Sequence, residues 1–235
     1  MRGIDEIVRG LVRAANLIGS ADPAVLEIVW LSLFVTGFAL AISTLIGVPT
    51  GAALGLWSRY RVRGLVTVLL YTGMGLPPVV VGLAMYLLLS RSGPLGCLDW
   101  LFTPSAMVLA QTAIALPVVA GLTMTAVQSV EPGLRLQVRA LGATRWQELA
   151  AVLREARIGV MAAIVAAFGS IISEVGAVLL VGGDIEGRTR VLTTAIVLNT
   201  RMGEFDLALA LGIILLALTF LANVILFWLQ QRSEG

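Results

Sequence analysis

The sequence predicts an all-helical protein that crosses a membrane several times. Apolar residues make up 58% of the 235 residues, charged residues only 13%, and the mean hydropathy is +0.97. Soluble domains usually contain about 25% charged and 45–50% apolar residues. A water-soluble core of this chain length cannot hide such an excess of apolar surface, whereas a lipid bilayer can.

Five apolar stretches are long enough to cross the hydrocarbon core as helices, which takes about 20 residues each. In lipid, backbone groups are satisfied only within helices or closed barrels. The stretches are continuous rather than alternating, which favours helices over barrel strands. The expected spans are residues 24–46, 65–89, 104–127, 158–181 and 207–229.

Ahead of the expected transmembrane domain, residues 21–231, the first 20 residues predict an amphipathic helix. Its apolar residues recur at helical spacing while charged residues fall between them; the apolar set is Ile4, Ile7, Val8, Leu11, Val12, Ala15 and Ile18. Such a helix lies at a membrane interface or packs on its own bundle, and the sequence leaves both possibilities open.

Composition excludes several kinds of site. The chain has no histidine and one cysteine, Cys97, which excludes a histidine metal site, a Ser-His-Asp triad, a Cys-His pair and an internal disulfide. It has no lysine and no GxxxxGK[ST] motif, so it cannot hydrolyse ATP with P-loop machinery. We expect no catalytic residue, metal or cofactor in this chain, and no nucleic-acid partner, because its arginines form no dense block.

The arginines also indicate an orientation. With five spans, the connections 57–64 and 128–157 lie on the same side of the membrane as Arg232. That side carries nine arginines, and the other side carries seven. Positive residues prefer the cytoplasm. The expected topology therefore has the N-terminus outside and the C-terminus in the cytoplasm.

The connection at 128–157 is too polar to cross the membrane and too long for a tight turn. Its pattern predicts two short amphipathic helices separated by Gly142, where a residue that takes left-handed geometry can end a helix. A helix–glycine–helix unit that protrudes from a bundle offers a compact convex surface to a groove on a soluble partner. An ordinary interfacial loop is the alternative.

This loop resembles the cytoplasmic coupling loop of binding-protein-dependent ABC importer permeases. The family pattern is Glu-Ala-Ala, three residues, Gly, and about nine residues later Ile-x-Leu-Pro. Leu136-Gln137-Val138 stands in place of Glu-Ala-Ala, and Arg154-Glu155 in place of Leu-Pro. The residues that match, with a tryptophan at a familiar position, are Arg139, Ala140, Leu141, Gly142, Ala143, Thr144 and Trp146.

The resemblance covers roughly residues 25–230. Segments 76–83 and 93–96 resemble the second-span region of molybdate, tungstate and sulfate permeases, and residues 173–177 resemble their Gly-Glu-Phe-Gly-Ala segment. The departures within the loop are most similar to tungstate-type permeases. The resemblance implies a permease half that pairs with a copy of itself in a bacterial or archaeal cytoplasmic membrane. It also implies two ATPase subunits inside, which bind ATP and Mg, and a solute-binding protein outside.

Unusual residues within the spans are candidates for the transport pathway or its gate. Glu174 is expected about 25 Å along the fourth helix, at 1.5 Å per residue, where it would bond across helices near an outer gate. Pro77 and Pro78 are expected to break the second span and free carbonyls toward a cavity. The full candidate set is Pro77, Pro78, Gly82, Ser173, Glu174 and Gly176.

The sequence thus predicts the permease subunit of an ABC importer for an oxyanion, with tungstate as the expected cargo and molybdate, sulfate or another solute as alternatives. A secondary transporter or a membrane scaffold is the alternative of another class. An ion-driven transporter would be expected to show inverted repeats and several buried ionisable residues. The location of the 1–18 helix, the role of Glu174 and re-entry of residues 191–200 into the membrane stay open.

Overall fold

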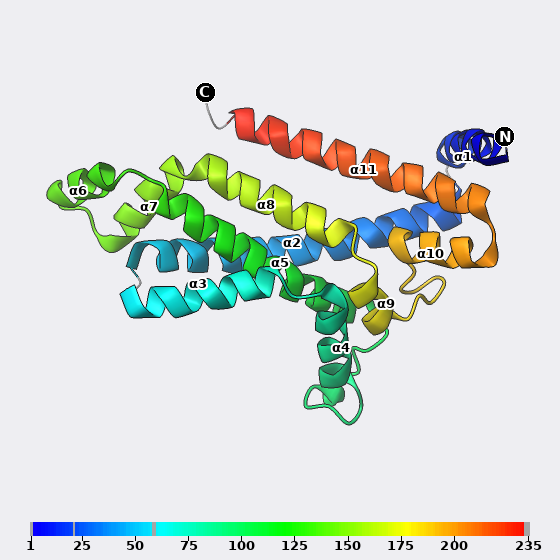
Figure 1. The fold of residues 1–235 in the computed structure, drawn as a ribbon, viewed down its shortest axis with the longest axis horizontal. Helices are drawn as coiled ribbons and strands as arrows, with labels where there is room; N and C mark the ends of the chain where they lie inside the picture. The colour runs from blue at the N-terminus through cyan, green and yellow to red at the C-terminus, as the bar shows by residue number, and fades with distance from the viewer. Residues whose placement is uncertain (1, 21, 58–59, 233–235) are drawn as a thin grey trace. The chain divides into compact units, whose positions relative to one another are not determined.

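The computed structural model describes residues 2–20, 22–57 and 60–232, and within those ranges the chain is built of helices and connections without a strand (Figure 1). This confirms the all-helical expectation. The side chains of Arg61 and Arg63, and those of residues 2–7, lie outside the described part, as does Arg59. The elements are α1 (Arg2–Gly19), α2 (Pro23–Trp57), α3 (Tyr60–Met74), α4 (Pro78–Leu89), the 3₁₀ helix η1 (Gly96–Leu98), α5 (Pro104–Gln128), α6 (Pro132–Ala140), α7 (Arg145–Glu155), α8 (Arg157–Ile172), α9 (Gly176–Gly182), α10 (Leu192–Met202) and α11 (Phe205–Arg232).

In the described part of the chain, three helices are individually long and apolar enough to cross a membrane: α2, α5 and α11. Two bent pairs, α3 with α4 and α7 with α8, raise the number of candidate spans to five. The expected break at Pro77 is present, since α3 ends at Met74 and α4 begins at Pro78. The first span is longer than predicted, because the small and apolar residues after Ile46 let α2 continue to Trp57.

The prediction of one continuous fourth span was wrong. Helix α8 ends at Ile172, and α9 begins only at Gly176. The carboxylate of Glu174 accepts a hydrogen bond from the backbone N–H of Ala177 at 3.0 Å, which starts a new helix. A side chain that bonds to nearby backbone in this way competes with continuation of the helix before it.

The described residues form two compact units. Unit 1 comprises residues within 1–38, 77–111 and 172–224, and unit 2 those within 39–76, 112–171 and 225–235. The transmembrane domain expected at 21–231 therefore contains two units, each with its own core.

In unit 2, the C-terminal half of α2 packs closely on α5 through glycines spaced four residues apart. A Cβ on Gly47 or Gly55 would come within 2.9 Å of the side chain of Val119 or Val127, and one on Gly51 would overlap the Ala120 carbonyl. Small residues on one helix face let two backbones approach in this way. This seam fixes α2 against α5 along the part of α2 that leads to its end at Trp57.

In unit 1, the N-terminus of α10 is tied to two other elements. The N–H of Leu192 donates to Ser32 Oγ of α2 at 2.8 Å, and Thr193 Oγ1 donates to the carbonyl of Glu174 at 3.0 Å. Leu192 and Ala195 are buried against Leu211 of α11. At 11 residues, α10 is too short to cross a bilayer, which takes about 20 residues.

Of the two possibilities that the sequence left open for α1, the structure shows packing on its own bundle. A Cβ on Gly10 would come within 2.7 Å of Leu209 of α11, and Ala14 is buried, so one face of α1 packs on its own bundle. Other apolar side chains of α1 are exposed: Val8, Leu11, Val12 and Ile18.

We predict that Gly51→Ala lowers the melting temperature of the purified protein, because a methyl group there meets the Ala120 backbone and forces α2 away from α5. Gly37→Ala, in the same helix, is the matched control: its added Cβ meets nothing within 4 Å, so replacement should be neutral or stabilise by up to about 1 kcal/mol. Equal melting temperatures for the two variants would contradict the close seam.

Candidate functional site

The segment from α6 to α7, residues 132–155, folds as an elbow of two helices. Gly142 lies between them with φ +81°, a conformation that glycine adopts without strain, and its N–H donates to the carbonyl of Arg139 at 2.9 Å. Thr144 and Gln147 then cap α7 reciprocally: Thr144 N–H donates to Gln147 Oε1 at 2.8 Å, and Gln147 N–H donates to Thr144 Oγ1 at 3.4 Å. The predicted helix–glycine–helix unit is confirmed.

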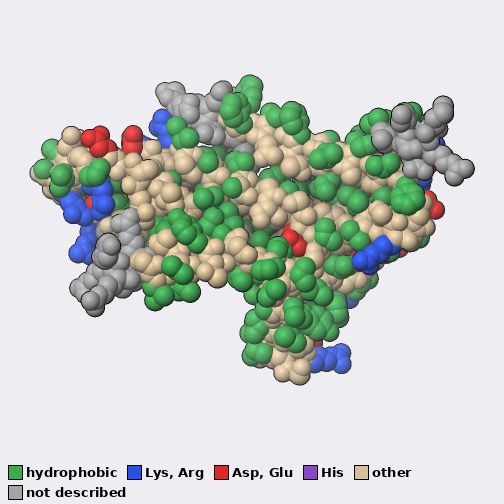
Figure 2. Space-filling model, in the orientation of Figure 1, with side chains coloured by type: hydrophobic (Ala, Val, Ile, Leu, Met, Phe, Trp, Pro, Cys, Tyr) green, Lys and Arg blue, Asp and Glu red, His purple; other side chains and the backbone are tan. Residues whose placement is uncertain are grey.

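The tip of the elbow presents apolar side chains among charged ones. Leu136, Leu141 and Trp146 are 68%, 87% and 75% exposed, respectively. Figure 2 shows that charged side chains gather over α6 and α7 on the face drawn. Exposed large apolar groups in a polar segment are typical of a surface that contacts a protein partner or a membrane interface. Of the predicted coupling residues, Leu141 and Trp146 are therefore the large apolar side chains that the fold leaves exposed.

Below the tip, a buried carboxylate joins the two helices. Glu148 of α7 is only 2% exposed, and its oxygens accept hydrogen bonds from Arg139 Nε at 2.9 Å and from Arg135 Nε at 3.2 Å. Arg135 also donates from its terminal nitrogen to the carbonyl of Leu56, in the last turn of α2, at 2.9 Å. This arginine thus links the elbow to the end of α2.

Burial by itself raises the pKa of the Glu148 carboxyl group. Hydrogen bonds from Arg139 and Arg135, together with their positive charges, outweigh this effect, so the net pKa lies below its ordinary value of 4.5. Glu148 is therefore ionised at neutral pH and holds both guanidinium groups.

Apolar contacts complete the root of the elbow. Leu149 and Val152 of α7 and Ala156 share a buried cluster with Leu56 of α2 and Val127 of α5. At Ala156 the chain turns from α7 into α8 through a bend of 71°. The elbow thus rests on the same seam of α2 and α5 that the small residues create.

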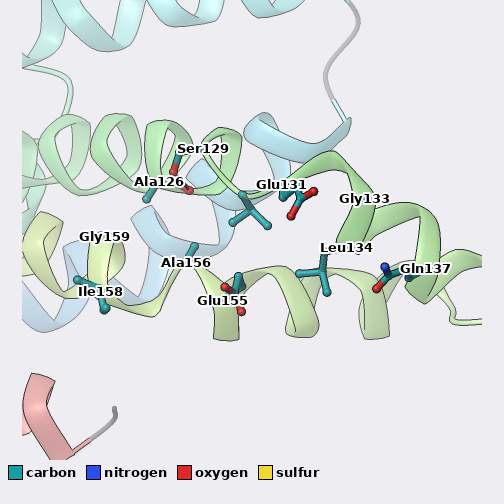
Figure 3. Close-up of a pocket in the computed structure, with 11 residues that line it drawn as sticks. Ala126, Ser129, Glu131, Gly133, Leu134, Gln137, Glu155, Ala156, Ile158 and Gly159 are labelled. Atoms are coloured by element: carbon teal, nitrogen blue, oxygen red, sulfur yellow. Dashed lines mark hydrogen bonds between the residues drawn. The ribbon is translucent and has the colours of Figure 1, made fainter.

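A cleft of about 480 Å³ opens between the start of α6 and the junction of α7 with α8 (Figure 3). Glu131, Gly133 and Leu134 line one side of it, and Glu155 and Ile158 line the other. Within the described part of the chain, neither Glu131 nor Glu155 forms an ion pair, in contrast to Glu148. Beside the cleft, the arginine–Glu148 contacts join α6 to α7, and the apolar cluster joins α7 to α2 and α5.

In unit 1, the fold brings most of the predicted pathway and gate residues together around α4 and α9. Pro77 is the N-cap residue of α4. A Cβ on Gly82 would come within 2.5 Å of the Ala177 backbone, and one on Gly176 within 2.5 Å of the Val79 side chain. Residues from two distant segments thus form one closely packed helix pair, with Ser173 and Glu174 in the connection that leads into α9.

The bond that Glu174 makes differs from the expected one. Its carboxylate accepts from the N–H of Ala177, at the start of the following helix, rather than across helices. The cross-element bond at this position uses the Glu174 main chain, whose carbonyl accepts from Thr193 Oγ1 of α10. The side chain therefore starts α9, and the backbone anchors α10.

Sequence reasoning missed Glu148. A signal was available, because Arg135 and Arg139 are four residues apart and so share one face of a helix. Glu148 is adjacent to Leu149 and four residues before Val152, on the apolar side of α7. A carboxylate on the apolar side of one helix can pair with two arginines on one face of the preceding helix.

The family of binding-protein-dependent transport system inner membrane components matches the chain over residues 47–235. The chain belongs to this family. This chain is 46% identical over 209 residues to a probable anion ABC transporter permease protein of Haloferax volcanii, and the match covers 87% of this chain and 90% of that one. It is 38% identical over 229 residues to the tungstate uptake system permease protein of Peptoclostridium acidaminophilum, covering 97% and 100% of the two chains.

Solved structures agree with this assignment. An inward-facing form of the MetNI methionine ABC transporter matches 90% of this permease and 97% of that chain, with a TM-score of 0.76 at 18% identity, which shows a common fold. The expected family and fold are thus confirmed, and the permease is a multi-pass membrane protein whose relatives are transporter subunits.

We predict that acidification loosens the elbow. Because the pKa of Glu148 is lower in the folded state, its stabilising contribution is fully present above about pH 4.5 and disappears as the pH falls through the lowered pKa. Hydrogen exchange of residues 135–152, corrected for intrinsic rates, should show constant protection from neutral pH down to pH 4.5 and a decline below it. Glu148→Gln should abolish this pH dependence; an unchanged profile in that variant would contradict the assignment.

Proposed function

We propose that this chain forms the membrane pathway of an ABC importer for an oxyanion, tungstate first, and that the elbow transmits movement from separate ATPase subunits. The observation that carries the proposal is the elbow itself. It combines a glycine turn at Gly142 with exposed Leu141 and Trp146 on a rigid two-helix support. A groove on an ATPase would cover these side chains.

The energy would come from elsewhere, because the chain has no P-loop motif and no lysine. Two ATPase subunits would bind ATP and Mg on the cytoplasmic side. A second copy of the permease would complete the pathway, and a solute-binding protein would dock outside. Closure of the ATPases on ATP would move the elbows and rock the two permease copies between inward and outward access.

This mechanism requires the elbow and the C-terminus to face the cytoplasm, with the N-terminus outside. The arginine asymmetry of the connections supports that orientation. Specific cysteine labelling at Arg145→Cys in a Cys97→Ser background should occur only when the cytoplasmic face is accessible. Labelling from outside intact cells would exclude the mechanism.

The cargo proposal draws on two observations. Relatives over nearly the whole chain are named for tungstate and for an anion. The five expected spans contain no arginine that could hold a dianion tightly, which suits a pathway that only passes the ion on. Selectivity would then lie in the external binding protein. The packed α4–α9 pair with Pro77, Pro78, Gly82, Ser173, Glu174 and Gly176 is the proposed gate.

We predict that vesicles containing the permease, its ATPase and its binding protein take up tungstate in an ATP-dependent manner. Competition should rank tungstate above molybdate and molybdate above sulfate. Preferred uptake of sulfate would contradict tungstate as the cargo but would leave the importer function in place. Uptake driven by an ion gradient without ATP would instead indicate a secondary transporter.

We predict that Leu141→Asp reduces capture of the ATPase at least tenfold, because it places a charge at the most exposed apolar contact of the elbow. Met202→Asp is the matched control: Met202 is also an exposed apolar residue, at the end of α10 on the predicted outer side. Co-purification from membranes measures both. Retained binding in Leu141→Asp, or equal loss in both variants, would contradict docking at the elbow.

A further inference from the structure

Glu148 is a buried charge that the docking surface does not use. The other two carboxylates close to the elbow, Glu131 and Glu155, are exposed and line the cleft, whereas Glu148 is almost fully enclosed. A charge is retained at such a position only when partners satisfy it. Here Arg139 and Arg135 do so, through contacts of 2.9 and 3.2 Å.

The contacts form a continuous series that leads from the elbow to α2. Arg139 is near the end of α6, Glu148 is in α7, and Arg135 continues from Glu148 to the Leu56 carbonyl. Carbonyls in the last turn of a helix have no partner within that helix, and a cation there also favours the helix dipole. One network therefore connects both helices of the elbow to the last turn of α2.

The neighbouring apolar cluster cannot supply the same geometry. Leu149 and Val152 contact Leu56 through non-directional interactions, which hold surfaces together but allow sliding. Paired guanidinium and carboxylate groups fix direction as well as distance. A buried ion pair contributes little net stability compared with apolar replacements, but it can select a single arrangement.

We propose that Glu148 is a positioning residue that locks α6 and α7 to the end of α2, so that movement of the elbow tip is transmitted to α2 rather than absorbed by the loop. The coupling half of this inference rests on the proposed function. The structural half, a fixed distance between α7 and α2, does not depend on any partner.

The distance can be measured directly in the full-length chain. Spin labels at Thr50→Cys in α2 and Ala150→Cys in α7, both exposed positions of unit 2, report it in a Cys97→Ser background reconstituted in nanodiscs. The network predicts one narrow distance distribution. In Glu148→Gln the distribution should broaden at least twofold, and Glu148→Asp, which keeps the charge, should restore most of the narrow component.

Coupling is measured in the complete transporter, as tungstate molecules moved per ATP hydrolysed. Glu148→Gln should bind the ATPase within about twofold of the unaltered chain, yet move at least tenfold less cargo per ATP. Glu148→Asp should recover to within about threefold. Glu155→Gln, which removes an exposed carboxylate from the same helix, is the control and should change neither measurement.

The outcomes separate the two proposals. If the unaltered chain captures no ATPase, the proposed function fails, and the distance measurement still decides whether Glu148 fixes the elbow. If the ATPase binds and Glu148→Gln keeps both a narrow distribution and a normal transport ratio, the positioning role is overturned. If Glu148→Gln does not accumulate in membranes, Arg135→Gln, which removes the bonds to Leu56 and to Glu148 but keeps the Arg139–Glu148 pair, should show the same broadening; a narrow distribution there also overturns the proposal.

Discussion

Every interruption of a helix inside a membrane protein must satisfy the backbone groups that it exposes, and this requirement governs the structure. At the break before α9, the Glu174 carboxylate accepts a hydrogen bond from the N–H of Ala177, and the Glu174 carbonyl accepts one from Thr193 Oγ1. At the start of α10, the N–H of Leu192 donates a hydrogen bond to Ser32 Oγ of α2. The candidate gate could therefore be built only where polar side chains from neighbouring elements supply these partners.

The proposed gate and the elbow depend on different kinds of contact. Around α4 and α9, Gly82 and Gly176 permit close approach of backbones, so small residues define the proposed gate. At the elbow, the Arg135–Glu148–Arg139 network fixes orientation in a polar setting. Shape complementarity dominates where lipid surrounds the helices, and directed electrostatic contacts dominate where water does.

Much of this architecture could be predicted from the sequence, because hydropathy and the residues that start and end helices are local properties. The apolar stretches located the main spans, Pro77 marked the break before α4, and Gly142 located the turn of the elbow. The end of α8 at Ile172 was missed, because Glu174 is a single charge between two apolar stretches, and the sequence does not show that its carboxylate accepts from Ala177 N–H and starts a new helix. The Glu148 network was also missed, since pairing across a loop depends on how two helices meet. Leu56 could not have been identified at all, because the group involved is a main-chain carbonyl 79 residues from Arg135.

The exposed leucine at the elbow tip has a consequence for the life of the protein in the cell. Leu141 is 87% exposed and apolar, and it lies directly before the left-handed turn at Gly142. A newly made copy that finds no partner displays this surface to chaperones and proteases. If the proposed ATPase covers this tip, copies of the permease in excess of the ATPase would be degraded, and the amounts of the two subunits would match without any dedicated regulator.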